Sequence, residues 1–279
     1  MAQSDNVSEY RRLNQANWDD RAPLHAASPE YAVDRFRTDR SFLSDVIRFD
    51  LPRLGDIRGL DGVHLQCHIG TDTISLARLG VTITGLDFSP ASLKQARALA
   101  ERTGTAIEFV QSEVYDAVKV LGAERFDLVF TGIGALCWLP DVQRWADTVA
   151  ALLRPGGRLF IREGHPMLWS IDETRTDRLT IGYAYFETPE PMVFAEETTY
   201  VAADHTLTET TTHQWNHGLG EIVGAVLGAG LTLTGLEEHD SVPWDALPGR
   251  MIRGNDGEYR LETHREQLPL SYTLQARKP

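Results

Sequence analysis

Residues 63–90 read VHLQCHIGTDTISLARLGVTITGLDFSP, and this stretch decides the fold. The run at 63–67 is an apolar segment of strand length, residues 73–79 have helical periodicity, and residues 81–87 form a second apolar run. Pro90 then opens another predicted helix, because a proline in the first turn of a helix lacks only an N–H that would have no partner there. The stretch therefore predicts strands that alternate with helices.

The same alternation continues toward residue 163. Three further strands are predicted at 106–112, 126–132 and 158–163, and a helix at 142–153 separates the last two. Strands that alternate with helices form a mainly parallel sheet whose two faces are both covered.

The chain on either side of this core has a different texture. Helices with polar faces are predicted at 10–20 and 41–49, the second of them stopped by Pro52. Residues 178–215 are rich in Thr, Tyr, Phe and Val, which favours β structure. The remaining predicted segments are a helix at 219–229, a strand at 231–239, a Pro-, Gly- and Asp-rich loop at 244–258 and a strand at 270–277.

The last two predicted strands read as a hairpin at the edge of the sheet. We therefore expect an α/β fold with a doubly wound, mainly parallel sheet of seven strands, an N-terminal helical cap and a β-rich insertion before the last strands. The expected divisions are a cap at 1–55, a ligand-binding core at 56–164, a lid insertion at 165–218, and a helix with a strand hairpin at 219–279.

Composition limits the classes of partner. The 279 residues contain 40 acidic and 27 basic side chains, a net charge of -13, and a surface of this sign repels nucleic acid and anionic lipid. Neither Cys67 nor Cys137 belongs to a disulfide framework or a zinc motif, so no metal is expected. The most apolar run, 222–236, is too short to span a bilayer, and the first twenty residues do not read as a signal peptide. We expect a soluble cytoplasmic protein without nucleic-acid or membrane partners.

Three candidate binding positions follow three consecutive strands, where doubly wound sheets bind their ligands. Gly70 lies in the first strand-to-helix turn, and its missing Cβ permits a close backbone approach or a positive φ. Asp87 ends the second strand, where a carboxylate suits a ribose diol. Glu113 follows the third strand beside Val114 and would suit the amine of an adenine ring. Each position alone has an ordinary structural explanation, whereas the three together indicate an adenosine ligand.

The ordered segments of residues 63–163 resemble the class I S-adenosylmethionine-dependent methyltransferases, a Rossmann-like family with seven strands. The segments that carry this resemblance are LQCHIGTDTISLARLG, VTITGLDFSP, FVQSEV, FDLVFTGIGALCWLPD and LLRPGGRLFIRE. The family's first motif, acid-x-Gly-x-Gly-x-Gly, is altered, because its four key positions hold Gln66, His68, Gly70 and Asp72. The resemblance implies S-adenosylmethionine as cofactor and S-adenosylhomocysteine as product.

The resemblance also implies which residues bind that cofactor. Gly70 and Gln66 would lie at the methionine part, Asp87 at the ribose, and Phe88 with Val114 on the two faces of adenine. Trp18, from the NWDDRA segment, would cover the sulfonium, and Arg21 would pair with the carboxylate. The complete implied set is Trp18, Gln66, His68, Gly70, Asp72, Asp87, Phe88, Glu113, Val114, Thr131 and Ile133.

Two histidines are candidate catalytic bases. His165 follows the fifth predicted strand, and His217 stands at the entrance to the last predicted helix; the imidazole titrates near neutral pH. Each also has a structural interpretation, in helix capping or in bonding to lid backbone. No Asn-Pro-Pro-Tyr run follows the fourth strand, which by the resemblance argues against amino-methylation of nucleic-acid bases.

The expected acceptor is a small molecule, methylated at an oxygen, nitrogen or carbon atom, and the expected assembly is a monomer or homodimer. One alternative function is S-adenosylmethionine binding without methyl transfer, as in a cyclase, an isomerase or a regulatory module. Another is a nucleotide-dependent oxidoreductase, which the missing Gly-x-Gly-x-x-Gly pattern disfavours.

Overall fold

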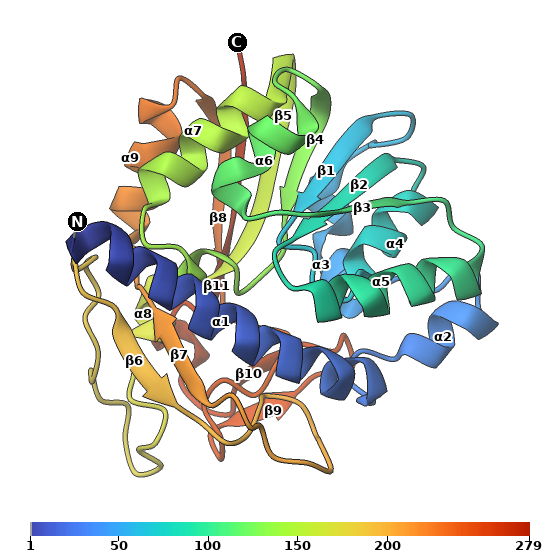
Figure 1. Cartoon of the computed structure of the whole chain (residues 1–279). Coiled ribbons are helices and arrows are strands. Elements are labelled where there is room, and N and C mark those ends of the chain that lie inside the picture. The colour runs from blue at the N-terminus through green and yellow to red at the C-terminus, as the bar shows by residue number, and fades with distance from the viewer. Residues whose placement is uncertain (1) are drawn as a thin grey trace.

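The computed structural model describes residues 2–279, with side chains from residue 9 onward. A seven-stranded sheet forms the centre of the molecule, and helices cover both of its faces (Figure 1). Its strands are β1 (Asp61–Leu65), β2 (Thr82–Asp87), β3 (Glu108–Gln111), β4 (Phe126–Thr131), β5 (Leu153–Gly164), β8 (Thr232–His239) and β11 (Ser271–Arg277).

The strand order is β3-β2-β1-β4-β5-β11-β8, and the pairs from β3 to β5 are parallel. Only β11 runs opposite to the other six strands, and it is antiparallel to β5 on one side and to β8 on the other. The prediction of a doubly wound, mainly parallel seven-stranded sheet is confirmed, with β8 and β11 at one edge. The chain order reverses between β1 and β4, where such sheets open a crevice for ligands.

Two layers of helices enclose this sheet. On one face, α3, α4 and α5 bury a core that includes Ile47, Ile74 and Leu93. On the other face, Trp145 of α7 and Ile222 of α9 pack among strand residues. The helices and single turns of this core are α3 (Asp45–Leu54), α4 (Thr71–Arg78), α5 (Pro90–Thr103), η1 (Val114–Asp116), α6 (Ala117–Leu121), η2 (Leu136–Trp138), α7 (Val142–Leu152) and α9 (Leu219–Gly228).

The remaining elements form a second layer at the carboxyl ends of the strands. Two small antiparallel sheets, β6 with β7 and β9 with β10, lie there together with α1 (Figure 1). Their bounds are α1 (Ala2–Ala27), α2 (Val33–Thr38), α8 (Pro166–Trp169), β6 (Met192–Ala195), β7 (Thr211–Gln214), β9 (Met251–Arg253), β10 (Tyr259–Leu261) and η3 (Arg265–Gln267).

Three sequence predictions of where elements begin or end are wrong in detail. The first helix extends to Ala27 rather than Asp20, because its buried polar face is held by the insertion. Pro52 does not stop α3, which ends two residues later with Leu54 fully buried. The predicted loop at 244–258 contains β9, whose partner is β10.

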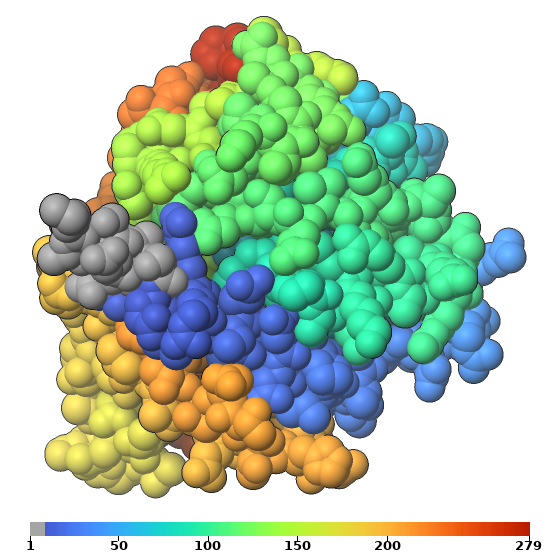
Figure 2. All heavy atoms as spheres, viewed as in Figure 1, coloured from blue at the N-terminus to red at the C-terminus, as the bar shows by residue number. Residues whose placement is uncertain are grey.

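Helix α1 lies between the core and the insertion (Figure 2, blue between green and orange). Asn14 bonds the backbone of β7 twice, with its Nδ2 donating to His213 O and its Oδ1 accepting from His213 N, both at 2.8 Å. One helical turn further, Asn17 Nδ2 donates to Glu209 O, and Asp20 Oδ2 accepts from the backbone N of Thr208. Side chains of α1 thus bond the backbone of the segment at 208–213.

Candidate active site

One cavity of about 760 Å³ opens at the carboxyl ends of the parallel strands, within the range of about 300–1,000 Å³ for small-molecule sites. Of the eleven side chains predicted to bind a cofactor, nine line it: Trp18, Gln66, His68, Asp72, Asp87, Phe88, Glu113, Val114 and Ile133. Gly70 and Thr131 do not. The cavity runs from the ends of β1–β3, which we call the cofactor end, to the insertion and the segment at 243–259, which we call the acceptor end.

Gly70 lies behind the wall of the cavity. It precedes α4 with a φ of 79°, and a Cβ there would come within 2.9 Å of Ala96 Cβ in α5. Glycine is therefore required by the left-handed backbone and by the close helix, since any other side chain would be strained there. Thr131 is fully buried, and its Oγ1 has no hydrogen-bond partner among the described residues.

The turn between β1 and α4 is fixed by Asp87 at the end of β2. Its two carboxylate oxygens accept from the backbone N of His68 and of Ser89, each at 2.8 Å. Burial raises the pKa of Asp87 to about 6, and these backbone donors oppose that shift. The carboxylate therefore organises two backbone turns while one side of it lines the cavity.

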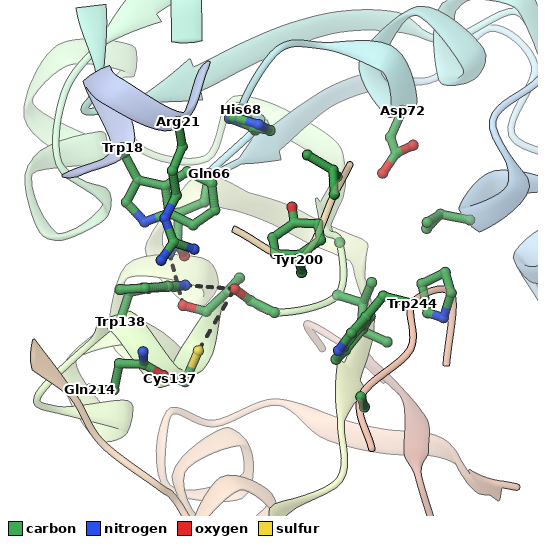
Figure 3. Close-up of a pocket in the computed structure, with 18 of the residues that line it drawn as sticks. Trp18, Arg21, Gln66, His68, Asp72, Cys137, Trp138, Tyr200, Gln214 and Trp244 are labelled. Atoms are coloured by element: carbon green, nitrogen blue, oxygen red, sulfur yellow. Dashed lines mark hydrogen bonds between the residues drawn. The ribbon is translucent and has the colours of Figure 1, made fainter. Parts of the chain in front are cut away.

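Gln66 presents an unsatisfied acceptor to the same end of the cavity. Its Nε2 donates to Ala135 O at 2.9 Å, whereas its Oε1 is buried and has no hydrogen-bond partner within residues 9–279 (Figure 3). A buried oxygen in this state is costly unless a ligand donates to it. The amide therefore offers a hydrogen-bond acceptor to a bound N–H group.

Arg21 brings a positive charge from α1 into the cavity. The residue is 4% exposed, and its guanidinium carbon lies 5.5 Å from the centre of the Trp18 ring. Its Nε and Nη2 make no hydrogen bond to any described residue, and Glu196 Oε2 stands 3.6 Å from Nη2. Burial lowers the pKa of Arg21 because desolvation disfavours the charged form. A buried guanidinium with free donors requires an anion for its full stabilisation.

Four aromatic rings crowd this end of the cavity. Trp18 packs edge-on against His68 at 4.9 Å and against Trp138 at 5.2 Å between ring centroids. His68 Nε2 lies 2.8 Å from His25 Nδ1 on α1, and His68 Nδ1 lies 3.0 Å from Ser92 Oγ on α5. Burial lowers the pKa of His68 to about 3, so the ring is neutral near pH 7. The large side chain at this motif position therefore ties the turn to two helices.

The segment after β3 forms a further part of the cofactor end. Glu113 Oε2 pairs with Arg11 Nε of α1 at 3.0 Å, and burial raises the pKa of this carboxyl. Val114 is 4% exposed and lines the cavity near Phe88.

The wall after β4 depends on Glu163, a residue that the sequence analysis did not select. Its carboxylate accepts from the backbone N of Gly134, of Ala135 at 2.7 Å and of Leu136 at 2.8 Å, and also from Gly164 N. These bonds hold the loop that carries Ile133 and Trp138 into the cavity. The sequence signal that could have identified Glu163 is an acidic residue near the end of a buried strand.

Neither candidate base lines the cavity. His217 has Nδ1 2.6 Å from Glu187 Oε2 and Nε2 2.7 Å from Leu139 O, so both ring nitrogens face acceptors of the protein itself and neither faces the cavity. His165 Nδ1 accepts from Met167 N at 3.0 Å, and its Nε2 lies 2.9 Å from Glu238 Oε1. The prediction that these two histidines are catalytic bases is therefore not carried forward, because both serve the local backbone and neighbouring carboxylates.

Aromatic and acidic side chains dominate the acceptor end. Trp169 and Trp244 stack with ring centroids 5.7 Å apart and an interplanar angle of 17°. The other members of this wall include Leu168, Ile171, Tyr183, Met192, Phe194 and Tyr259, whereas Tyr200 packs on His25 with ring centroids 4.8 Å apart. No cluster of metal-binding side chains is found among the described residues, and none of their helices is long and apolar enough to cross a membrane.

Comparison with known proteins agrees with this geometry. A family model described as a methyltransferase domain matches residues 63–159. The ubiquinone biosynthesis O-methyltransferase of Methylobacterium nodulans is 28% identical over 261 residues, which cover 90% of each chain. The enzyme of the same description from Methylobacterium sp. (strain 4-46) is 30% identical over 159 residues, 55% of this chain and 60% of the relative.

Solved structures share the fold. An S-adenosylmethionine-dependent methyltransferase from Mesorhizobium loti superposes with a TM-score of 0.57 and 20% identity, over 84% of this chain and 98% of its own. A putative enzyme of the same class from Listeria monocytogenes gives a TM-score of 0.60 at 14% identity, over 84% and 97%.

Proposed function

The chain is a class I S-adenosylmethionine-dependent methyltransferase, and we propose that it methylates a hydroxyl oxygen of a small aromatic molecule. The acceptor binds at the acceptor end of the cavity, between the sheet edge and the insertion. S-adenosylmethionine, when bound, supplies an activated methyl group on sulfur. The protein holds the two molecules in line, and the hydroxyl proton of the acceptor passes to solvent water as its oxygen gains the methyl group.

The observation that carries the cofactor assignment is the pair of unsatisfied groups at the cofactor end. Gln66 Oε1 and the free donors of Arg21 lie in one cavity, and an amino acid carries the complementary ammonium and carboxylate. Gln66 accepts from the ammonium, and Arg21 pairs with the carboxylate. This chain thus uses a neutral amide where the family motif has an acid.

The remaining cofactor contacts follow the strand ends. Asp87 accepts from the ribose hydroxyls, while Phe88 and Val114 enclose the adenine and Glu113 accepts from its amine. The curated relatives are named as O-methyltransferases, which supports oxygen as the accepting atom. The aromatic wall around Trp169 and Trp244 supports a planar acceptor, since aromatic side chains favour stacked or edge-on partners.

Mass spectrometry tests this function directly. The protein is incubated with S-adenosylmethionine and a set of phenols and aliphatic alcohols of similar size. A gain of about 14 Da on a phenol, with one S-adenosylhomocysteine formed per product, is expected because the cofactor supplies a methyl group. Methylation of the aliphatic alcohols alone, or methylation at carbon or nitrogen, would contradict the proposal.

A further inference from the structure

Asp72 is the part of the altered glycine motif that the cofactor contacts do not explain. It stands in the first turn of α4, where the family motif has a glycine, and its carboxylate points into the cavity (Figure 3). A Cβ built on Gly132, directly after β4, would lie 3.4 Å from Asp72 Oδ2. The carboxylate thus reaches across the end of β1 to the end of β4.

The position of Asp72 assigns it to the acceptor end. In Figure 3, the Tyr200 side chain stands between Asp72 on one side and Trp18 with Gln66 on the other. Ser44, the N-cap of α3, lines the cavity together with Asp72, and its hydroxyl lowers the pKa of the Asp72 carboxyl. The Ser44 hydroxyl is itself held by Ile47 N and Ser75 Oγ, each at 3.3 Å, so this hydroxyl is fixed in place.

The surroundings of Asp72 combine an apolar wall with an excess of negative charge. Away from Gln66 and Arg21, the described lining residues Asp45, Glu173 and Asp245 are acidic and Arg35 and Arg253 are basic, so that with Asp72 the carboxylates outnumber the guanidinium groups. Arg253 is neutralised by Asp45, with Nη2 3.3 Å from Oδ2. This excess of negative charge would repel an anionic acceptor, whereas it would not repel a neutral or cationic one.

We infer that Asp72 determines acceptor specificity: its carboxylate accepts a hydrogen bond from an O–H or N–H group of an aromatic acceptor that is uncharged or cationic. The same carboxylate excludes acceptors that carry an anionic group. This inference rests on the proposed function, because it assigns the acceptor to the end of the cavity away from Gln66.

Ionisation of Asp72 is compatible with this role. Burial raises the pKa of Asp72 to about 6, the Ser44 hydroxyl and Arg162 act in the opposite direction, and Asp45 adds to the rise. His64, near the same glycine, has its pKa lowered by burial to about 3 and is neutral. Asp72 is therefore largely ionised at pH 7.5.

The test uses three probes that share one ring and differ in charge: catechol, dopamine and 3,4-dihydroxyphenylacetate. Each is titrated calorimetrically at pH 7.5 into the complex of the protein with S-adenosylhomocysteine. We expect catechol and dopamine to bind at least about tenfold more tightly than the acid. In Asp72→Asn, the ratio of dopamine to acid affinity should fall about tenfold, and the affinity for S-adenosylhomocysteine should stay within about twofold of the original protein.

Asp147→Asn is the matched control, because it removes the same charge from an exposed carboxylate of α7 that does not line the cavity. Its affinity ratio should change less than about threefold. An unchanged ratio in Asp72→Asn, a tenfold loss of S-adenosylhomocysteine affinity in that variant, or failure of all three probes to bind would each overturn the inference. If the original protein does not bind S-adenosylhomocysteine, the proposed function fails together with the inference. If it binds S-adenosylhomocysteine but the affinity ratio does not change in Asp72→Asn, the inference alone fails.

Discussion

The two ends of the cavity are built from different material. At the cofactor end, Asp87 and Gln66 extend from strands or turns of the central sheet; Asp87 accepts from two backbone N–H groups, and Gln66 donates to a backbone carbonyl. At the acceptor end, Trp244 and Tyr183 stand outside the strands and helices of the structure. A site on rigid elements can be organised before the ligand arrives, whereas a wall made of connecting segments can vary with the acceptor. This contrast explains how proteins of one fold can bind the same cofactor and yet take many chemically different acceptors.

The largest expected effect on stability comes from replacing Glu163, whose carboxylate holds the loop after β4. Glu163→Gln replaces a carboxylate that accepts four backbone N–H groups by an amide with one acceptor oxygen. We expect a loss of about 2–4 kcal/mol in the free energy of unfolding, measured by urea denaturation. Binding of S-adenosylhomocysteine should weaken too, because Ala135 O holds Gln66.

Glu262→Gln on the exposed surface is the control for this substitution and should leave both quantities unchanged. If Glu163→Gln unfolds at the same urea concentration as the original protein, the loop does not depend on the carboxylate.

Arg21, at the cofactor end, is expected to stabilise the complex with S-adenosylhomocysteine but to destabilise the ligand-free protein. Arg21→Met removes a buried cation with two unpartnered nitrogens, so the ligand-free protein should gain thermal stability. The affinity for S-adenosylhomocysteine should fall by about 1–3 kcal/mol, since the ligand carboxylate loses its partner. Differential scanning calorimetry and titration calorimetry measure the two effects. Arg12→Met, on the same helix but exposed and paired with Glu9, is the control and should change neither the thermal stability nor the affinity. If Arg21→Met binds S-adenosylhomocysteine as tightly as the original protein, Arg21 is not the partner of the ligand carboxylate.

The pH dependence of cofactor binding tests the state of Asp87. Its pKa is raised to about 6 by burial, so the carboxylate that accepts from a ribose is present above that pH and is lost as the pH falls through it. We expect the dissociation constant of S-adenosylhomocysteine to rise about tenfold between pH 7.5 and pH 5. Asp87→Asn should bind weakly with no such slope, and a flat profile in the original protein would show that ionisation of Asp87 does not matter.

The smallest effects on binding are expected at the two histidines outside the cavity. His165→Gln and His217→Gln should each lower the free energy of unfolding by about 1–2 kcal/mol, because each loses at least one buried hydrogen bond. The affinity for S-adenosylhomocysteine and the pH profile of methyl transfer should be unchanged within about twofold. A lost limb in the pH–rate profile of either variant would restore that histidine as a base.

The sequence predicts the cofactor end far better than the acceptor end, and the reason is physical. Strands such as β1 and β4 are buried on both faces, so their apolar runs and the glycines and prolines between them are visible locally. The wall near Trp244 is held by contacts between distant segments, such as the stacking of Trp169 on Trp244, which no local pattern encodes. Likewise, the extension of α1 to Ala27 follows from Arg21 and His25, polar residues buried against the insertion. Glu163 was missed because its partners are backbone N–H groups, which leave no trace in residue types.

The most direct test of the two-ended cavity compares one substitution at each end. S-adenosylhomocysteine is titrated calorimetrically into the original protein, into Asp87→Ala and into Trp244→Ala. The account predicts tight binding to the original protein, a loss of at least about a hundredfold in Asp87→Ala, and a change of less than about threefold in Trp244→Ala. Equal losses in the two variants, or normal binding to Asp87→Ala, would contradict the division of the cavity into a cofactor end and an acceptor end.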